Sequence, residues 1–121
     1  MEVLREVGGA ELVAMSAAIV AARLRNLPVV LDGYVVTASA LPLTLSRPGA
    51  IEHCLVGHCS SEPGHRRLLE RLGKQPLLDL EMRLGEGSGA ALAWPLLASA
   101  VCVLNEMASF ESAGVSDRES P

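Results

Sequence analysis

Two long stretches of this chain carry almost no charge, and together they constrain the fold more than any other feature. In residues 11–25 only Glu11 and Ser16 are polar before Arg23, and residues 87–104 contain no charged side chain. Apolar side chains recur at helical spacing in the first stretch, which predicts a helix that is apolar nearly all round. Helices of this kind are covered by other elements on most sides, so both stretches need partners.

The second stretch reaches the length of roughly 18 residues at which an apolar segment can cross a membrane. It contains Ala, Gly and Ser as much as Leu, and Pro95 interrupts it. Its flanks carry Arg83, Glu86 and Glu106 but no cluster of Lys or Arg that would set an orientation. We therefore expect a long helix buried in protein and no membrane partner, with a small membrane protein as the distant alternative.

Short apolar runs between the helices predict a parallel sheet. Residues 28–31 form a continuous apolar run that ends in an Asp-Gly pair, and residues 52–57, with His-Cys-Leu-Val at 53–56, are expected to form a second short strand. Continuous hydrophobicity is typical of parallel strands that are covered on both faces. Helices are expected at 34–46 and at 66–72, and the order of helices and strands is that of an α/β fold.

The apolar surface is large for a chain of 121 residues, the length of a single domain. Two helices apolar all round and two buried strands need more cover than so short a chain can provide. A two-stranded parallel sheet also has open edges, and the apolar residues 76–80 are too few to assign. We therefore expect part of a larger domain, or a chain that must associate.

Composition excludes several classes of function. The net charge is −4 and aromatic residues make up 2% of the chain, so it lacks the basic surface and stacking side chains of a nucleic-acid-binding protein. Three cysteines are an odd number, which argues for reduced thiols in a cytoplasmic protein rather than a disulfide framework. The first residues carry two acids and lack the basic start of a signal peptide.

A glycine-rich loop holds one candidate catalytic carboxylate. Glu86 lies between Gly85 and Gly87, just before the long apolar helix. Glycines let a backbone approach a ligand closely, and a helix N-terminus attracts anions. Glu86 could act there as a general base or hold a pair of hydroxyls. Alternatively it merely caps the helix, where a carboxylate is favourable in any case.

Two further segments are candidates for ligand contacts. Asp32 leaves the carboxyl end of a strand, where α/β folds bind ligands, although an Asp-Gly pair is also an ordinary turn. Ser60 and the N–H groups after it open a helix, with a Glu near the third position. They could bind a phosphate, or the serine could simply cap the helix.

Histidines and cysteines cluster between residues 53 and 65, but their spacing does not favour a metal. His53 and Cys54 point to opposite faces of a strand, and His53 and Cys59 lie too far apart along it. No Cys-x-x-Cys element is present, and zinc sites usually contain one. We therefore expect no metal site, and a structural or substrate-loop role for these side chains instead.

Five motifs in a fixed order resemble one known family. They are V-G-G-A-E-L-V-A-M-S-A-A at 7–18, V-V-L-D-G at 29–33, G-H-C-S-S-E-P-G-H at 57–65, P-L-L-D-L-E-M-R-L-G-E-G-S-G-A-A-L-A at 76–93 and N-E-M-A-S-F at 105–110. Over essentially residues 5–115 the chain resembles the C-terminal third of the nicotinate-nucleotide–dimethylbenzimidazole phosphoribosyltransferase family. Among these motifs, S-x-E-P-G-H, P-L-L-D-L and L-G-E-G-[TS]-G-A are the most specific for the family.

The resemblance implies a fold and an activity. The family joins a Rossmann-like parallel-sheet domain with flanking helices to a small helical domain, and the enzyme is a homodimer. Residues 1–86 would end the α/β nucleotide-binding domain, 87–112 would be a long buried helix of the helical domain, and the polar residues 113–121 a disordered tail. The family transfers phosphoribose from nicotinate mononucleotide to 5,6-dimethylbenzimidazole, which gives α-ribazole 5′-phosphate and nicotinate in the assembly of the lower ligand of cobalamin.

The same resemblance assigns site residues. The family's general base maps onto Glu86, its phosphate-side serine maps onto Ser60, and the backbone of Leu84 and Gly85 lies by the nucleotide. No metal and no cofactor are implied. The substrate-binding residues that we expect are Asp32, Gly33, Ser60, Leu84, Gly85 and Gly87.

The chain departs from the family in charge and in length. Where the family has Ser-His-Arg-Ser, residues 57–60 are Gly-His-Cys-Ser, so a positive charge is lost. Full members are roughly two and a half to three times as long, and the remainder carries a phosphate-contacting lysine, a glycine-rich nucleotide loop and much of the benzimidazole pocket.

Two classes of function follow. The first is the phosphoribosyltransferase, which acts on nicotinate mononucleotide and a benzimidazole-type base, as a homodimer or in association with a missing N-terminal segment. The second is a catalytically incomplete fragment that acts as a dimerisation or binding module.

Overall fold

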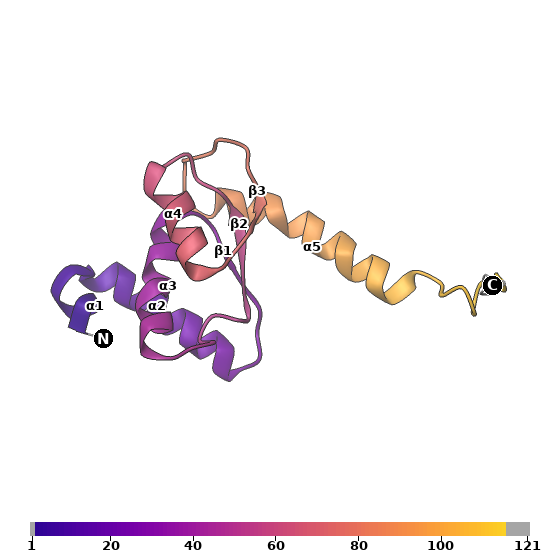
Figure 1. The fold of residues 1–121 in the computed structure, drawn as a ribbon, viewed down its shortest axis with the longest axis horizontal. Coiled ribbons are helices and arrows are strands. Elements are labelled where there is room, and N and C mark those ends of the chain that lie inside the picture. Colours follow the sequence, from indigo (N-terminus) through magenta and orange to yellow (C-terminus); the bar gives the residue numbers. More distant parts are fainter. Residues whose placement is uncertain (1, 116–121) are drawn as a thin grey trace, which may run out of the picture.

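Figure 1 shows the fold in a computed structural model that describes residues 2–115. Helices and short strands form a body, and one long helix leaves it. Residues 110–114 form turns, and the tail expected at 113–121 lies outside the described residues from 116 onward. The elements in chain order are α1 (Glu2–Val7), α2 (Gly9–Leu24), β1 (Val29–Leu31), α3 (Tyr34–Ser46), β2 (Cys54–His58), α4 (Pro63–Leu72), β3 (Pro76–Leu78) and α5 (Ser88–Glu106).

The sheet is parallel and has the strand order β1-β2-β3. Val30 lies opposite Leu55 in the first pair, and Val56 lies opposite Pro76 in the second. The α/β class and the parallel strands are therefore confirmed. The ambiguous segment after residue 75 supplies a third strand, which sequence periodicity could not assign because only three residues pair.

The second strand begins and ends later than expected. β2 runs from Cys54 to His58, whereas the sequence predicts a strand at 52–57. A turn in which the Cys54 N–H donates to the Ile51 carbonyl, at 3.0 Å, holds the chain before the strand. The backbone N–H of His58 donates to the Asp32 carbonyl at 3.2 Å, which extends the strand to the polar end of the motif.

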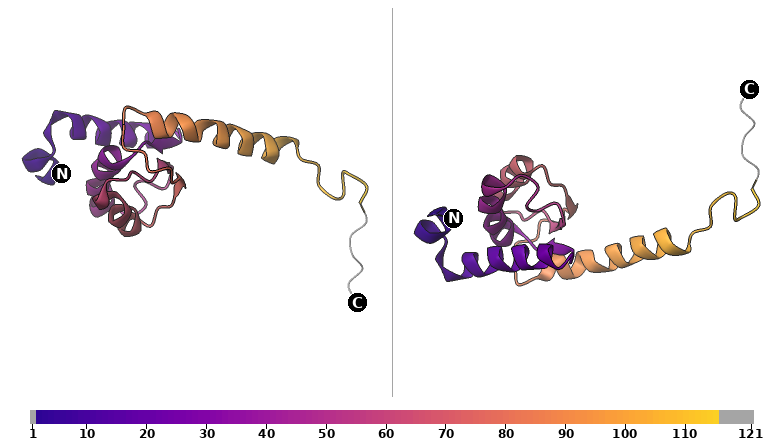
Figure 2. Two further views of the ribbon diagram at one scale, coloured as in Figure 1. Left: turned by 90° about the horizontal axis from the view of Figure 1, so that it is seen from above. Right: turned by 90° about the horizontal axis from the view of Figure 1, so that it is seen from below.

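A small apolar core lies between the sheet and the helices α2, α3 and α4. In Figure 2, α2 and α5 lie in one row along one side of the body, and the strands, α3 and α4 lie beside that row. Fully buried side chains from the strands meet those of the three helices here. The core residues are Ile19, Leu31, Ala40, Leu43, Ile51, Cys54, Val56, Cys59 and Leu69.

The helix ends follow local chemistry in some places and not in others. Gly73 ends α4 in the left-handed conformation, with φ 63°, as its position predicts. α3 continues through Pro42. Gly8 separates α1 from α2. α4 begins at Pro63 with Glu62 as its N-cap and without a side-chain cap, so the prediction of a serine cap is wrong.

The two apolar helices are far less covered than expected. In α2 only Ser16 and Ile19 are buried, and in α5 only Gly89 and Ala93. Every residue from 98 to 115 is exposed, and α5 projects from the body (Figure 1). The long final helix is confirmed, but its burial is wrong for this chain, because nothing among residues 2–115 packs on its second half.

One helix in the described part of the chain, Ser88–Glu106, is long and apolar enough to cross a membrane by length and composition. Core helices of soluble proteins pass the same test. Such core helices are mostly buried, whereas only 11% of the apolar part of α5 is buried in this chain. Its apolar side chains therefore need a partner, as the sequence predicts.

Candidate functional site

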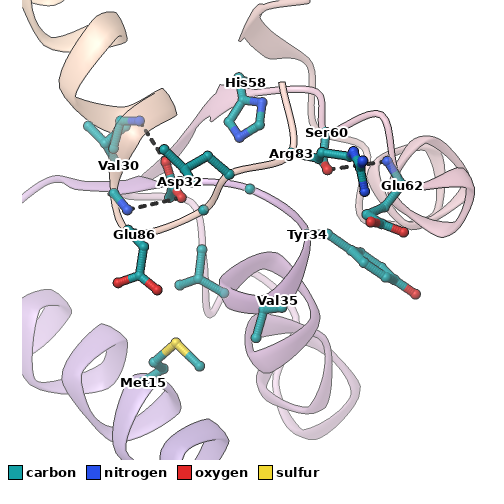
Figure 3. Close-up of a pocket in the computed structure, with 16 residues that line it drawn as sticks. Met15, Val30, Asp32, Tyr34, Val35, His58, Ser60, Glu62, Arg83 and Glu86 are labelled. Carbon is teal, nitrogen blue, oxygen red and sulfur yellow. Dashed lines mark hydrogen bonds between the residues drawn. The ribbon is translucent and has the colours of Figure 1, made fainter. Parts of the chain in front are cut away.

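A pocket of about 650 Å³ lies at the carboxyl ends of β1 and β2, and Figure 3 shows its lining. Its volume falls within the roughly 300–1,000 Å³ typical of small-molecule sites. The wall comes from segments far apart in the chain: the Asp-Gly pair after β1, the start of α3, the end of β2 and the glycine-rich loop before α5. All seven residues singled out from the sequence line it, namely Asp32, Gly33, Ser60, Leu84, Gly85, Glu86 and Gly87.

The Asp32 carboxylate binds the N-terminus of α5. One oxygen accepts the Gly87 N–H at 3.2 Å, and the other accepts the Ala90 N–H at 2.9 Å. Charge-assisted bonds of this kind satisfy two of the four free N–H groups that open a helix. Asp32 is therefore a structural cap from a distant segment, and it ties β1 to α5 across the pocket.

Glu86 is left free by that arrangement. The N-cap of α5 is Gly87, so the alternative in which Glu86 caps the helix is wrong. Figure 3 shows the Glu86 carboxylate directed away from Asp32, toward the side of the pocket where Met15 lies. The glutamate side chain is exposed to the pocket and to solvent, and it is available for chemistry.

The backbone around Glu86 has an uncommon conformation. Gly85, Glu86 and Gly87 have φ values of 76°, 57° and 79°, so three successive residues are left-handed. Glycine adopts this region freely, but for a glutamate it costs about 1 kcal/mol or more. Such strain persists where the surrounding structure imposes it, and it gathers at functional sites. Here the residue that follows Glu86 is held by the hydrogen bond from the Gly87 N–H to Asp32.

A buried histidine positions the Ser60 segment. The Ser60 N–H donates to Nδ1 of His65 at 2.8 Å, so Nε2 carries the ring proton and donates to Thr37 Oγ1 at 3.2 Å. Thr37 Oγ1 in turn donates to the Gly33 carbonyl at 2.7 Å. These three consecutive hydrogen bonds link the end of β2 to the Asp-Gly pair after β1. Burial, and secondly the nearby His58 ring, lower the pKa of His65, which favours this neutral form.

Ser60 itself is buried and its hydroxyl oxygen accepts the Glu62 N–H at 3.2 Å. The serine thus stabilises the turn before α4 rather than the helix end. Because Ser60 also lines the pocket, its hydroxyl proton can donate to a ligand there. Both a turn and a ligand contact are compatible with this geometry.

The charges of the pocket are mainly negative. Asp32, Glu62 and Glu86 line it, and Arg83 is the single cation among its lining residues. A phosphate-bearing ligand needs more positive charge than this wall supplies. Cys59 stands where the family motif quoted above has an arginine. It is buried next to this wall and adds no positive charge.

Sequence reasoning missed His58 and Tyr34, which also line the pocket. His58 ends β2 just as Asp32 follows β1, so the rule that ligands bind at the carboxyl ends of parallel strands could have identified it. The sequence analysis expected a structural or substrate-loop role for the whole cluster of histidines and cysteines and did not single out His58. Among residues 2–115 no group of three or more His, Cys, Asp or Glu side chains is arranged to hold a metal ion.

Known proteins resemble this chain closely. A family model described as "Phosphoribosyltransferase" matches residues 1–115. The proteins named nicotinate-nucleotide–dimethylbenzimidazole phosphoribosyltransferase from Rhizobium meliloti (strain 1021) and Brucella anthropi are each 55% identical, over 98% and 96% of this chain. The crystal structure of the protein of that name from Thermus thermophilus is 52% identical over 97% of the chain, with a TM-score of 0.88.

These matches cover only part of the relatives. The chain spans 35% of the Rhizobium meliloti protein and 35% of the Thermus thermophilus chain, about a third in each case. The likeness therefore accounts for nearly all of this chain while leaving two-thirds of each relative without a counterpart in it.

Proposed function

Because this chain belongs to the phosphoribosyltransferase family, we propose that it forms about a third of an enzyme that transfers phosphoribose from nicotinate mononucleotide to 5,6-dimethylbenzimidazole. The products are α-ribazole 5′-phosphate and nicotinate, in the assembly of the cobalamin lower ligand. The relatives' names support this reaction. A cytoplasmic location is part of the same proposal.

The observation that carries the proposal is the division of labour between two carboxylates at the start of α5. Asp32 occupies the helix N–H groups, so Glu86 faces the pocket without a structural duty. A general base needs this freedom, together with a position at the wall of a ligand site. We assign that role to Glu86.

The chemistry requires one base and no acid. A nitrogen of the benzimidazole attacks the anomeric carbon of the ribose, and the bond from that carbon to nicotinate breaks. The bonding electron pair neutralises the pyridinium nitrogen, so nicotinate leaves without a proton. The other nitrogen of the benzimidazole gives its proton to Glu86. The remaining work is orientation of two flat rings and one phosphate.

Substrate binding also requires groups beyond this pocket wall. One cation faces three acidic side chains, which is too little positive charge for a mononucleotide phosphate. Both edge strands of the three-stranded sheet lack a neighbouring strand among residues 2–115. We propose that a polypeptide equivalent to the rest of the relatives, or a second copy in a homodimer, completes the site.

The test is product formation in two settings. The purified chain is incubated with nicotinate mononucleotide and dimethylbenzimidazole, and α-ribazole phosphate is measured by mass spectrometry. The same assay is run on a chimera in which this chain replaces the matching third of the Rhizobium meliloti protein. We expect product from the chimera that disappears in its Glu86→Gln variant. A folded chimera without product would refute the proposed activity.

A second function is favoured by the exposed face of α5. Leu92, Trp94 and Leu96 are more than half exposed, as are Val101, Val103 and Leu104, and monomeric proteins rarely expose so large a continuous apolar surface. The alternative is a catalytically incomplete fragment that acts as a dimerisation or binding module. A defined oligomer in sedimentation, combined with an inactive chimera, would favour it.

A further inference from the structure

His58 is the least satisfied polar side chain in the described part of the molecule. The residue is 1% exposed, and neither Nδ1 nor Nε2 has a hydrogen-bond partner. Burying a polar group without a partner is destabilising. A leucine of similar size would fill the same space without this cost, so packing alone does not account for the imidazole.

Two glycines make room for the ring. A Cβ on Gly33 would lie 2.7 Å from Nε2, and a Cβ on Gly89 would overlap the ring. Any other residue at these positions would displace the histidine. Gly33 and His58 both line the pocket. In Figure 3 the ring stands at this wall, with Asp32 on one side and Ser60 on the other.

The neighbouring protein groups are already engaged elsewhere. Both carboxylate oxygens of Asp32 accept N–H groups of the α5 end. The Gly33 carbonyl accepts from Thr37, and the Ser60 N–H donates to His65. No group among residues 2–115 pairs with the ring nitrogens of His58, and His58 lines the pocket, so we look for its partner in the contents of the pocket.

We propose that His58 is a substrate-binding residue that forms a hydrogen bond with a ribose hydroxyl of the nucleotide. The proposal rests on the proposed function and deepens it. An imidazole presents two ring nitrogens that can take part in hydrogen bonds, and a hydroxyl can pair with either. The acidic side chains of the pocket lining make this wall less suited to the phosphate than to a sugar hydroxyl.

The first test uses the chimera, in which the rest of the site is present. The ring nitrogens of His58 are followed by NMR while nicotinate mononucleotide is added, with His53 and His65 as internal references. We expect the His58 signals to move most, and to move little with the 2′-deoxy or the 3′-deoxy analogue that lacks the contacted hydroxyl. Movement of the 84–87 backbone signals with stationary His58 signals would overturn the proposal.

The second test measures discrimination in the chimera. For the native chimera, removal of the contacted hydroxyl should lower kcat/KM about tenfold, the size of one neutral hydrogen bond. His58→Leu should lower kcat/KM for the natural nucleotide by a similar factor and discriminate no longer against the deoxy analogue. His58→Gln places an amide near the Nε2 position and should restore part of the discrimination. Thermal melting checks that the variants fold.

The outcomes separate the two proposals. Activity together with full discrimination in His58→Leu overturns the role of His58 and leaves the proposed function intact. An inactive native chimera with ligand-dependent His58 signals overturns the proposed reaction alone. An inactive native chimera whose His58 signals do not respond to the nucleotide overturns both.

Discussion

Asp32 and Glu86 are two carboxylates at the same helix end, and their environments differ completely. Asp32 reaches the α5 N-terminus from the far side of the pocket and binds two of its N–H groups. Glu86 is adjacent to that helix in sequence, yet it makes no such bond and lies in a left-handed turn between two glycines. Proximity in sequence to a helix end therefore does not decide which acid caps it. The tertiary cap leaves the local acid free.

The largest expected effect tests the free carboxylate. Glu86→Gln in the chimera should lower kcat by roughly 10²- to 10⁴-fold, the usual contribution of a general base, because the amide cannot take the proton of the acceptor. The melting temperature should hardly change, since Glu86 supports no structural bond. An unchanged rate in a folded variant would remove Glu86 from the mechanism and end the contrast with Asp32.

Removal of the capping carboxylate should affect stability instead. Asp32→Ala should lower the free energy of unfolding by about 2 kcal/mol, since two helix N–H groups lose a charged partner. Urea denaturation of the chain measures this loss. Asp32→Asn should cost less, because asparagine is also a good cap. Glu86→Ala is the matched control, and an equal loss in that variant would contradict the assignment of the two roles.

The buried His65 network predicts a pH dependence that sharpens the comparison. The pKa of His65 is lowered in the folded chain, so below its ordinary value of about 6.5 the unfolded chain binds the proton more readily. The stability from neutral His65 is therefore complete above that pH and is lost as the pH falls toward the folded value. The slope is at most about 1.4 kcal/mol per pH unit for one proton.

Urea denaturation between pH 7.5 and pH 5 measures that slope. His65→Gln should flatten the dependence of the free energy of unfolding on pH. His53→Gln should leave that dependence unchanged, since His53 lies outside the hydrogen bonds that join Ser60, His65 and Thr37. Identical curves for His65→Gln and the native chain would show that another group titrates.

The smallest expected effect concerns backbone strain. Glu86→Gly relieves the left-handed conformation and should raise the free energy of unfolding by about 1 kcal/mol or less, partly offset by the greater freedom of glycine in the unfolded chain. Glu62→Gly is the control, because Glu62 has a φ of −63° and gains nothing from glycine. A loss of stability in Glu86→Gly would mean that the loop is not strained.

Much of the fold could be predicted from local patterns. The continuous run before Asp32 predicts a buried parallel strand, and Gly73 predicts a helix end. The third strand could not be predicted, because three residues carry no periodicity. The exposure of α5 could not be predicted either, since its apolar composition states only that it needs cover and not where that cover comes from.

The residues of the site were predicted better than their roles. Motif order brings Asp32, Ser60 and Glu86 into one list, and the structure brings them into one pocket. The sequence could not reveal that Asp32 binds the Ala90 N–H, because 58 positions separate the two residues. It also hid His58, whose significance depends on unpartnered nitrogens and on the space left by Gly33 and Gly89.

By itself the sequence determined the fold class, the family, the set of residues near the pocket and the need of its apolar helices for partners. These properties depend on residue types and spacing, which are local. Only the tertiary structure decided which carboxylate is bound to a helix end, which is free, and which buried imidazole lacks a partner. Those distinctions depend on hydrogen bonds between groups that are distant in the chain, and they exist only once the chain has folded.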